Sequence, residues 1–250
     1  MSNIFQKIFI KRPKVHNLGY RIIPLGSYCL PRVISTLSML KPRKAQGEKT
    51  LPFDLGFFWD FDKILDILDN EFKTFYNDIK FGLINSNSAR DLEVLFNFNS
   101  NVKHWVSDKL SAIFNHEYMM TNIDEFKTRY DKRIESFYEY LKDEKYELYF
   151  LIASFSEIKL SQINRLKNII NRYRDKNSYN IIIINQCTHS YKINERNVYV
   201  IDEIDETFDR MLRANNTNWA GALKRKDVFP DAKKFYDDVT DNLKKIILKI

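Results

Sequence analysis

The feature that most constrains the fold is a series of uninterrupted apolar runs in the second half of the chain. These runs are Leu148–Ala153, Ile181–Ile184 and Val198–Ile201. Strands that are covered by helices on both faces, as in parallel sheets, have continuous rather than alternating apolar residues. Between the first two runs, residues 157–174 have apolar side chains at helical spacing, and Ser156 is the expected cap of that helix. Strand, helix and strand in succession predict an α/β fold with a mostly parallel sheet.

The first half of the chain supplies a further strand and more helices. Residues 21–25 form a short apolar run that predicts the first strand, and a helix over 30–40 follows it. Further helices are expected at 61–78, 123–142 (capped by Thr121) and 231–248, and short strands at 92–98 and 111–114. We therefore expect a single α/β domain over residues 21–250, of the three-layer, Rossmann- or flavodoxin-like type. A basic leader, residues 1–20, precedes it, and the sequence does not determine the order of that leader.

Composition narrows the class of protein. Only 6 residues are glycine and 6 are proline, which argues against a turn-rich all-β fold. No window approaches the ~18 consecutive apolar residues that span a membrane, and the N-terminal residues lack the pattern of a signal peptide. Two cysteines do not make a disulfide framework, so we expect a cytoplasmic protein in which both thiols are free.

The net charge of +7 does not by itself identify a partner. Lysine and arginine are mixed with acidic residues along amphipathic segments, which is typical of a solvated basic surface. The sequence contains no known nucleic-acid-binding motif, so no specific nucleic-acid partner is expected. The densest basic stretch is residues 224–226. Its charge keeps one alternative open, which is peripheral contact with an anionic membrane or with a phosphate-bearing ligand. The sequence does not determine the oligomeric state.

Polar and small residues follow each predicted strand. They are Gly26, Ser27 and Cys29 after the first strand, and Ser154, Asn185 and Asp202 after the later ones. Ligands of open parallel sheets bind at the carboxyl ends of the strands, so these residues are candidates for a site. The structural alternative is that strand ends are polar simply because loops are exposed.

Cys29 is the candidate nucleophile. It comes three residues after Gly26 and directly before the expected helix, so we place it in the first helical turn. The unpaired N–H groups and the positive end of the helix dipole stabilise a thiolate at that position. The structural alternative is a small buried hydrophobic residue, which is a common role for free cysteine.

A cysteine nucleophile needs a base within hydrogen-bond reach. Of the four histidines, His116 is the best placed, because it follows the apolar run at 112–114 and emerges from a strand into a loop. His104 is expected in a polar loop, and His16 lies in the leader. His189, close to Cys187, makes only a weak zinc signal without a second ligand pair, so no metal is expected.

Four short segments resemble a bacterial family named for papain-like cysteine peptidases. They are Leu25-Gly26-Ser27-Tyr28-Cys29, then Leu51-Pro52-Phe53-Asp54, then Phe114-Asn115-His116-Glu117, and then the helix segment from Tyr130 to Phe137. The resemblance covers most of residues 21–155. Leu55 stands where the family usually has tryptophan, and Lys132-Arg133 replaces a more uniform arginine pair.

The resemblance implies a mechanism. Cys29 would be the nucleophile, His116 the base and Asp54 the residue that orients the imidazole, while Asn185 and Asp202 are alternative orienting residues by their strand-end position. The backbone N–H groups of the Gly26–Leu30 turn would stabilise an oxyanion.

The acceptor decides the reaction. Water would make the protein a hydrolase, and a sugar hydroxyl would make it an acyltransferase. The resemblance further implies a small-molecule or glycan substrate, a role in surface-polysaccharide biosynthesis and coenzyme A as an acyl donor; no other cofactor is expected. The α/β pattern differs from the helical domain and antiparallel barrel of papain, so we expect the chemistry on another scaffold. The alternative function is a non-catalytic nucleotide- or phosphosugar-binding domain, with the anion held at the Gly26-Ser27 turn.

Overall fold

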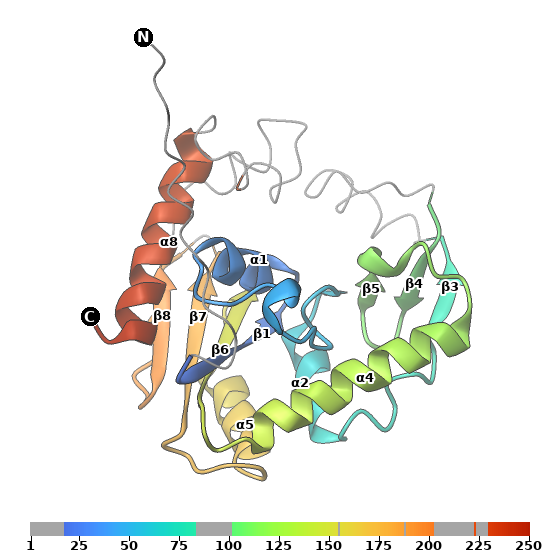
Figure 1. The fold of residues 1–250 in the computed structure, drawn as a ribbon, viewed down its shortest axis with the longest axis horizontal. Coiled ribbons are helices and arrows are strands. Elements are labelled where there is room, and N and C mark those ends of the chain that lie inside the picture. The colour runs from blue at the N-terminus through green and yellow to red at the C-terminus, as the bar shows by residue number, and fades with distance from the viewer. Residues whose placement is uncertain (1–17, 84–101, 155, 188, 203–222, 224–229) are drawn as a thin grey trace.

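A computed structural model describes residues 18–83, 102–154, 156–187, 189–202, 223 and 230–250. Its main sheet contains four strands, β1 (Tyr20–Gly26), β6 (Glu147–Ser154), β7 (Tyr179–Asn185) and β8 (Val198–Asp202). They pair in the order β1-β6-β7-β8, and every pair is parallel. The expected α/β fold with a parallel sheet flanked by helices is therefore confirmed (Figure 1).

The strand register brings the carboxyl ends of the four strands to one edge. Gly26 pairs with Ala153, Ser154 with Asn185, and Asn185 with Asp202. The polar residues expected at the strand ends therefore lie along the same edge of the sheet. Among the described strands the order runs in one direction from β1 to β8, with no reversal.

Helices cover the sheet on both faces because successive side chains of a strand point to opposite sides. One core combines alternate strand residues with α1 (Leu30–Leu37) and α8 (Pro230–Leu248). The other core combines the remaining strand residues with α2 (Phe61–Asp69), α4 (Ile123–Lys142) and α5 (Leu160–Ile170). Figure 1 shows α4 running from beside α5 to the second sheet.

The second sheet is antiparallel and was not predicted as a unit. Its strands are β2 (Phe57–Phe58), β5 (Ala112–Phe114), β4 (His104–Ser107) and β3 (Lys80–Gly82), in the order β2-β5-β4-β3. Only β5 corresponds to an expected strand, at 111–114, because strands of two to four residues are too short to show a period. The strand expected at 92–98 lies outside the described residues, as does most of the leader.

Several helix ends differ from their expected positions. The helix expected over 61–78 ends at Asp69, and Glu71 and Phe72 then adopt positive φ values of 56° and 62°. The apolar residues Phe72 and Phe75 that extended the pattern are buried, but in irregular backbone. Their helical spacing therefore reflected burial in the core and not a continuing helix.

Two expected caps are also wrong. Asn122, not Thr121, caps α4, where its side chain accepts from the N–H groups of Asp124 and Glu125. α5 begins at Leu160, after Lys159, and not beside Ser156. Two single-turn 3-10 helices, η2 (Lys44–Gln46) and η3 (Asn115–Glu117), complete the described elements. No helix in the described ranges is long and apolar enough to cross a membrane.

Candidate active site

The turn between β1 and α1 is set by a close approach of two backbones. Gly26 has a φ of +126°, and a Cβ atom there would lie 2.4 Å from the carbonyl oxygen of Ala153. Only glycine avoids this collision and adopts the conformation without strain. Ser27 donates its backbone N–H to the same oxygen over 2.9 Å. These contacts hold the start of the turn against β6.

Cys29 is the N-cap residue of α1, and its side chain is half-buried. Its carbonyl accepts the first helical hydrogen bond from the N–H of Val33, over 3.0 Å. The N–H groups of a first helical turn have no partner within the helix, and they attract negative charge. Pro31 lacks an N–H group, and the N–H of Ser27 is bonded to β6, so the turn offers fewer backbone donors than expected.

Tyr28 joins this turn to the loop after β7. Its hydroxyl donates to Oε1 of Gln186 over 2.7 Å, a contact between residues 158 positions apart. Burial raises the pKa of Tyr28 well above its ordinary value, so the hydroxyl stays protonated and remains a donor. Nε2 of Gln186 has no hydrogen-bond partner within the described part of the chain. Sequence reasoning missed Gln186, because nothing local marks a contact of such long range.

His116 lies on η3, directly after β5, and its side chain is exposed. The short strand β2 connects its surroundings with those of Cys29. Phe58 of β2 donates its N–H to the carbonyl of Ser27 over 2.7 Å, and Phe57 pairs with Ile113 of β5. The turn that carries Cys29 and the strand that leads to His116 therefore both contact the two residues of β2, Phe57 and Phe58.

His104 is not in a polar loop, as was expected, but in β4, where it is 5% exposed. Alternation along the strand puts His104 on the same face as Val106. Val106 belongs to the apolar cluster against which Cys29 packs. The sequence held no period-2 signal for this strand, since the two apolar residues at 105 and 106 stand side by side between two polar ones.

Asp54 is fully buried and paired with Arg32. Its Oδ2 accepts from Nη1 of Arg32 over 3.0 Å and from the N–H of Leu51 over 3.0 Å. Its Oδ1 is buried and has no hydrogen-bond partner among the residues described. Because Arg32 lies one helical turn after Cys29, Asp54 holds the start of α1. That it also orients an imidazole stays a prediction.

Asn185 and Asp202 are brought together, as their strand-end positions suggested. Nδ2 of Asn185 donates to Oδ1 of Asp202 over 2.6 Å, and Oδ1 of Asn185 accepts from the N–H of Cys187 over 2.9 Å. Ser154 accepts from the N–H of Ser156 through its hydroxyl. At the usual strand spacing, Asn185 and Asp202 lie two and three strands from β1, or about 10 and 14 Å. Their visible role is to hold the loop that carries Cys187.

Cys187 is buried in that loop, and its surroundings disfavour a thiolate. Burial raises the pKa of the thiol, and the carboxylates of Glu157 and Asp202 raise it further. Nε2 of His189 lies 3.4 Å from Oε2 of Glu157 at the surface. No group of three histidine, cysteine or acidic residues arranged to hold a metal occurs in the described ranges.

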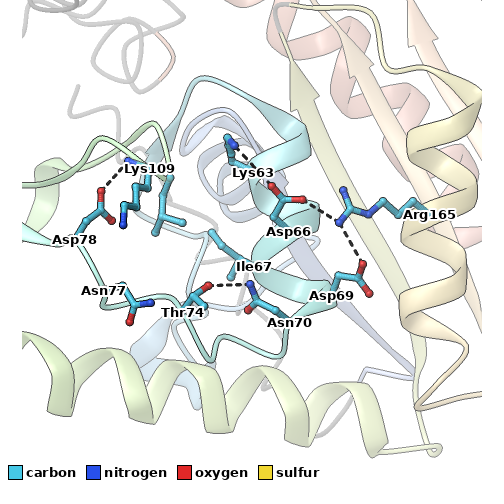
Figure 2. Close-up of a pocket in the computed structure, with 11 residues that line it drawn as sticks. Lys63, Asp66, Ile67, Asp69, Asn70, Thr74, Asn77, Asp78, Lys109 and Arg165 are labelled. Atoms are coloured by element: carbon cyan, nitrogen blue, oxygen red, sulfur yellow. Dashed lines mark hydrogen bonds and ion pairs between the residues drawn. The ribbon is translucent and has the colours of Figure 1, made fainter.

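An open cleft of 680 Å³ lies beside α2, away from the predicted site residues (Figure 2). Its carboxylates are already paired, since Nη2 of Arg165 contacts Asp66 over 2.9 Å and Asp69 over 3.2 Å. Hydrogen bonds from Arg172 and Arg165 lower the pKa of Asp69. The cleft therefore offers surface ion pairs and none of the predicted catalytic side chains.

Comparison with protein families matches residues 20–190 to the family described as "Putative papain-like cysteine peptidase". No curated protein and no solved structure matches the chain. The matched range includes Cys29, Asp54, His116 and Asn185 and ends before β8.

Proposed function

Because the chain belongs to the family described as "Putative papain-like cysteine peptidase", we propose that it is an enzyme that transfers acyl groups through Cys29. The observation that carries the proposal is the position of Cys29 at the N-terminus of α1, on a turn that Gly26 and Ser27 hold against the sheet. The thiolate attacks the acyl carbon and a C–S bond forms as the leaving group departs with a proton. An acceptor then takes the acyl group from sulfur, and the C–S bond breaks.

We propose His116 as the base, with Asp54, or Asn185 with Asp202, as the orienting group. The connection through β2 supports His116, because both its strand and the turn of Cys29 are bound to that element. His104 is the competing base, supported by its place on the sheet face that carries Val106. Of the orienting residues, Asp54 has the better support, since its Oδ1 has no hydrogen-bond partner in the described part of the chain.

The oxyanion would be stabilised by the remaining N–H groups at the start of α1 and by the side-chain amide of Gln186. The hydroxyl of Tyr28 binds the amide oxygen and so directs Nε2 to another side. A buried N–H group without an acceptor costs roughly 1–3 kcal/mol, so its presence beside the turn of Cys29 favours a function in binding.

The substrate and setting rest on the resemblance. We propose water or a sugar hydroxyl as the acceptor, a thioester such as that of coenzyme A as a donor, and a role in the cytoplasmic steps of surface-polysaccharide synthesis. A phosphosugar-binding domain without catalysis has less support, because the family that the chain matches is described by cysteine peptidase chemistry.

The finer fold class is also a proposal. Helices on both faces of the main sheet support the three-layer, Rossmann- or flavodoxin-like type. An experimental structure that resolves the segments outside the described ranges would test it.

The two cysteines allow a test within one molecule. Iodoacetamide labelling over a pH series, with each cysteine quantified by mass spectrometry, should give Cys29 a reaction midpoint below the ~8.5 of a free thiol. Cys187 should react only at higher pH, because its pKa is raised. A Cys29 that is inert, or whose midpoint is no lower than that of a free thiol, would contradict the proposal.

The histidines provide a second test. His116→Ala should slow the labelling of Cys29 at neutral pH by roughly tenfold or more, because the base that takes the thiol proton is lost. His104→Ala is the matched control and should leave the rate within about twofold. The reverse result would give the role of base to His104.

A further inference from the structure

Glu117 is the residue after His116 on η3, and its charged side chain is buried although the turn lies at the surface. Its carboxylate is 1% exposed, whereas the neighbouring His116 is exposed. A buried carboxylate is costly unless charged groups and hydrogen bonds compensate it. The turn that carries the proposed base is therefore anchored by a buried charge.

Two arginines of α4 hold this charge. Nη2 of Arg133 contacts Oε1 of Glu117 over 2.5 Å, and Nη1 of Arg129 contacts Oε2 over 2.7 Å. The side chain of Arg133 is 8% exposed, and that of Arg129 is about half exposed. Each carboxylate oxygen thus has its own guanidinium, a geometry that restricts the direction of the Glu117 side chain.

Hydrogen bonds that do not involve this carboxylate also hold the turn. The indole Nε1 of Trp105 donates to the carbonyl of Met120 over 2.7 Å, and the N–H of Met120 donates to the carbonyl of Glu117 over 3.0 Å. These bonds already close the chain between β5 and α4. The carboxylate of Glu117 adds a fixed attachment to α4.

The same arginine lies close to the elements that support Cys29. The guanidinium of Arg133 lies over the ring of Tyr130, 4.5 Å from its centroid. Burial raises the pKa of Tyr130, and the carboxylates of Glu117 and Asp54 both contribute to that rise. Asp54 in turn binds Arg32 of α1. The buried ion pair of η3 and α4 and the ion pair that holds the helix of Cys29 therefore both act on Tyr130, although no hydrogen bond among the described residues joins Tyr130 to Asp54.

We propose that Glu117 and Arg133 are positioning residues that hold η3, and with it His116, in place relative to α1. The inference rests on the proposed role of His116 as base. Neither residue touches substrate. They act by limiting the movement of an exposed imidazole whose distance from the thiol decides the rate of proton transfer.

The test uses iodoacetamide labelling of Cys29 at neutral pH in the full chain. In this reaction a bond forms between Sγ and carbon as the carbon–iodine bond breaks, iodide leaves with the electron pair, and the thiol proton passes to the base. Glu117→Gln, which keeps the size of the side chain, and Arg133→Met should each slow labelling by roughly 10- to 100-fold. Arg133→Lys should restore part of the rate, because it returns the positive charge.

Arg174→Met is the matched control for lost stability. Arg174 is as buried as Arg133 and binds backbone carbonyls near the other end of α4, including those of Leu141 and Tyr146. Its variant should melt earlier and yet label at the wild-type rate below its melting temperature. Labelling of Cys187 in each molecule reports any general loosening of the fold.

The outcomes separate this inference from the proposed function. If His116→Ala slows labelling while folded Glu117→Gln and Arg133→Met keep the wild-type rate, the positioning inference is wrong and the proposed base stands. If wild-type Cys29 reacts no faster than a free thiol, the proposed function fails first. If Arg174→Met slows labelling as much as Arg133→Met, the effect is general destabilisation and the inference is overturned.

Discussion

The two cysteines of this chain follow strands of the same sheet and meet opposite surroundings. Cys29 comes after β1 at the start of a helix, and its side chain is half-buried. Cys187 comes after β7, where its own burial and two nearby carboxylates raise its pKa. Both thiols lie at the carboxyl edge where α/β proteins bind ligands. Position at that edge therefore does not by itself make a nucleophile, because the local charges and the helix end decide whether a thiolate forms.

The largest expected difference is in turnover. Cys29→Ala should lower the hydrolysis of an activated ester such as p-nitrophenyl acetate by roughly a thousandfold or more, because the proposed acyl intermediate forms on its sulfur. Cys187→Ala should keep the rate within about threefold. Equal activity in the two variants, measured as release of p-nitrophenol, would remove the distinction between the two cysteines.

The carboxylates that support the two regions should differ in their effect on stability. Asp54→Asn removes the fully buried charge that pairs with the partly exposed Arg32, which should lower the free energy of unfolding by roughly 3 kcal/mol. Asp202→Ala removes one hydrogen bond of an exposed residue, at a cost of about 1 kcal/mol. Urea unfolding measures both. A smaller loss in Asp54→Asn than in Asp202→Ala would mean that α1 is held by other contacts.

The backbone of the Cys29 turn can be tested through its glycine. Gly26→Ala should destabilise the protein by about 2 kcal/mol, because the new methyl group meets the Ala153 carbonyl at a positive φ. Gly82→Ala is the matched control, since a Cβ atom there meets nothing within 4 Å. Thermal melting of both chains gives the comparison. Similar melting temperatures would show that the turn relaxes easily.

The smallest expected effect is the pH dependence that Cys187 contributes. Its folded-state pKa is raised, so its contribution to stability is complete below the pKa of the unfolded thiol and is lost as the pH rises through the folded-state pKa. The stability of the wild type relative to Cys187→Ala should therefore fall in alkaline urea titrations. The same comparison with Cys29→Ala serves as the control and should show no such fall.

The parallel sheet was the part of the fold most accessible from the sequence. Each predicted apolar run lies inside a strand of that sheet; the runs are 148–153, 181–184 and 198–201. The observed helix α4 begins and ends at the predicted residues, 123 and 142. The pattern is strong in β6 and β7 because these strands are buried along almost their whole length, and in α4 because its 20 residues repeat the helical spacing several times. The second sheet was missed because strands of two to four residues carry no readable period.

For the candidate site, the sequence determined which residues follow each strand, and hence that Gly26, Cys29, Asn185 and Asp202 share one edge. It also determined that His116 follows a strand, because the apolar run stops there. Only the tertiary structure decided that Asp54 pairs with Arg32, that Tyr28 reaches Gln186, and that Glu117 binds two arginines of α4. Local pattern records burial and backbone conformation, whereas the partner of a buried polar group is set by whichever distant segment packs against it.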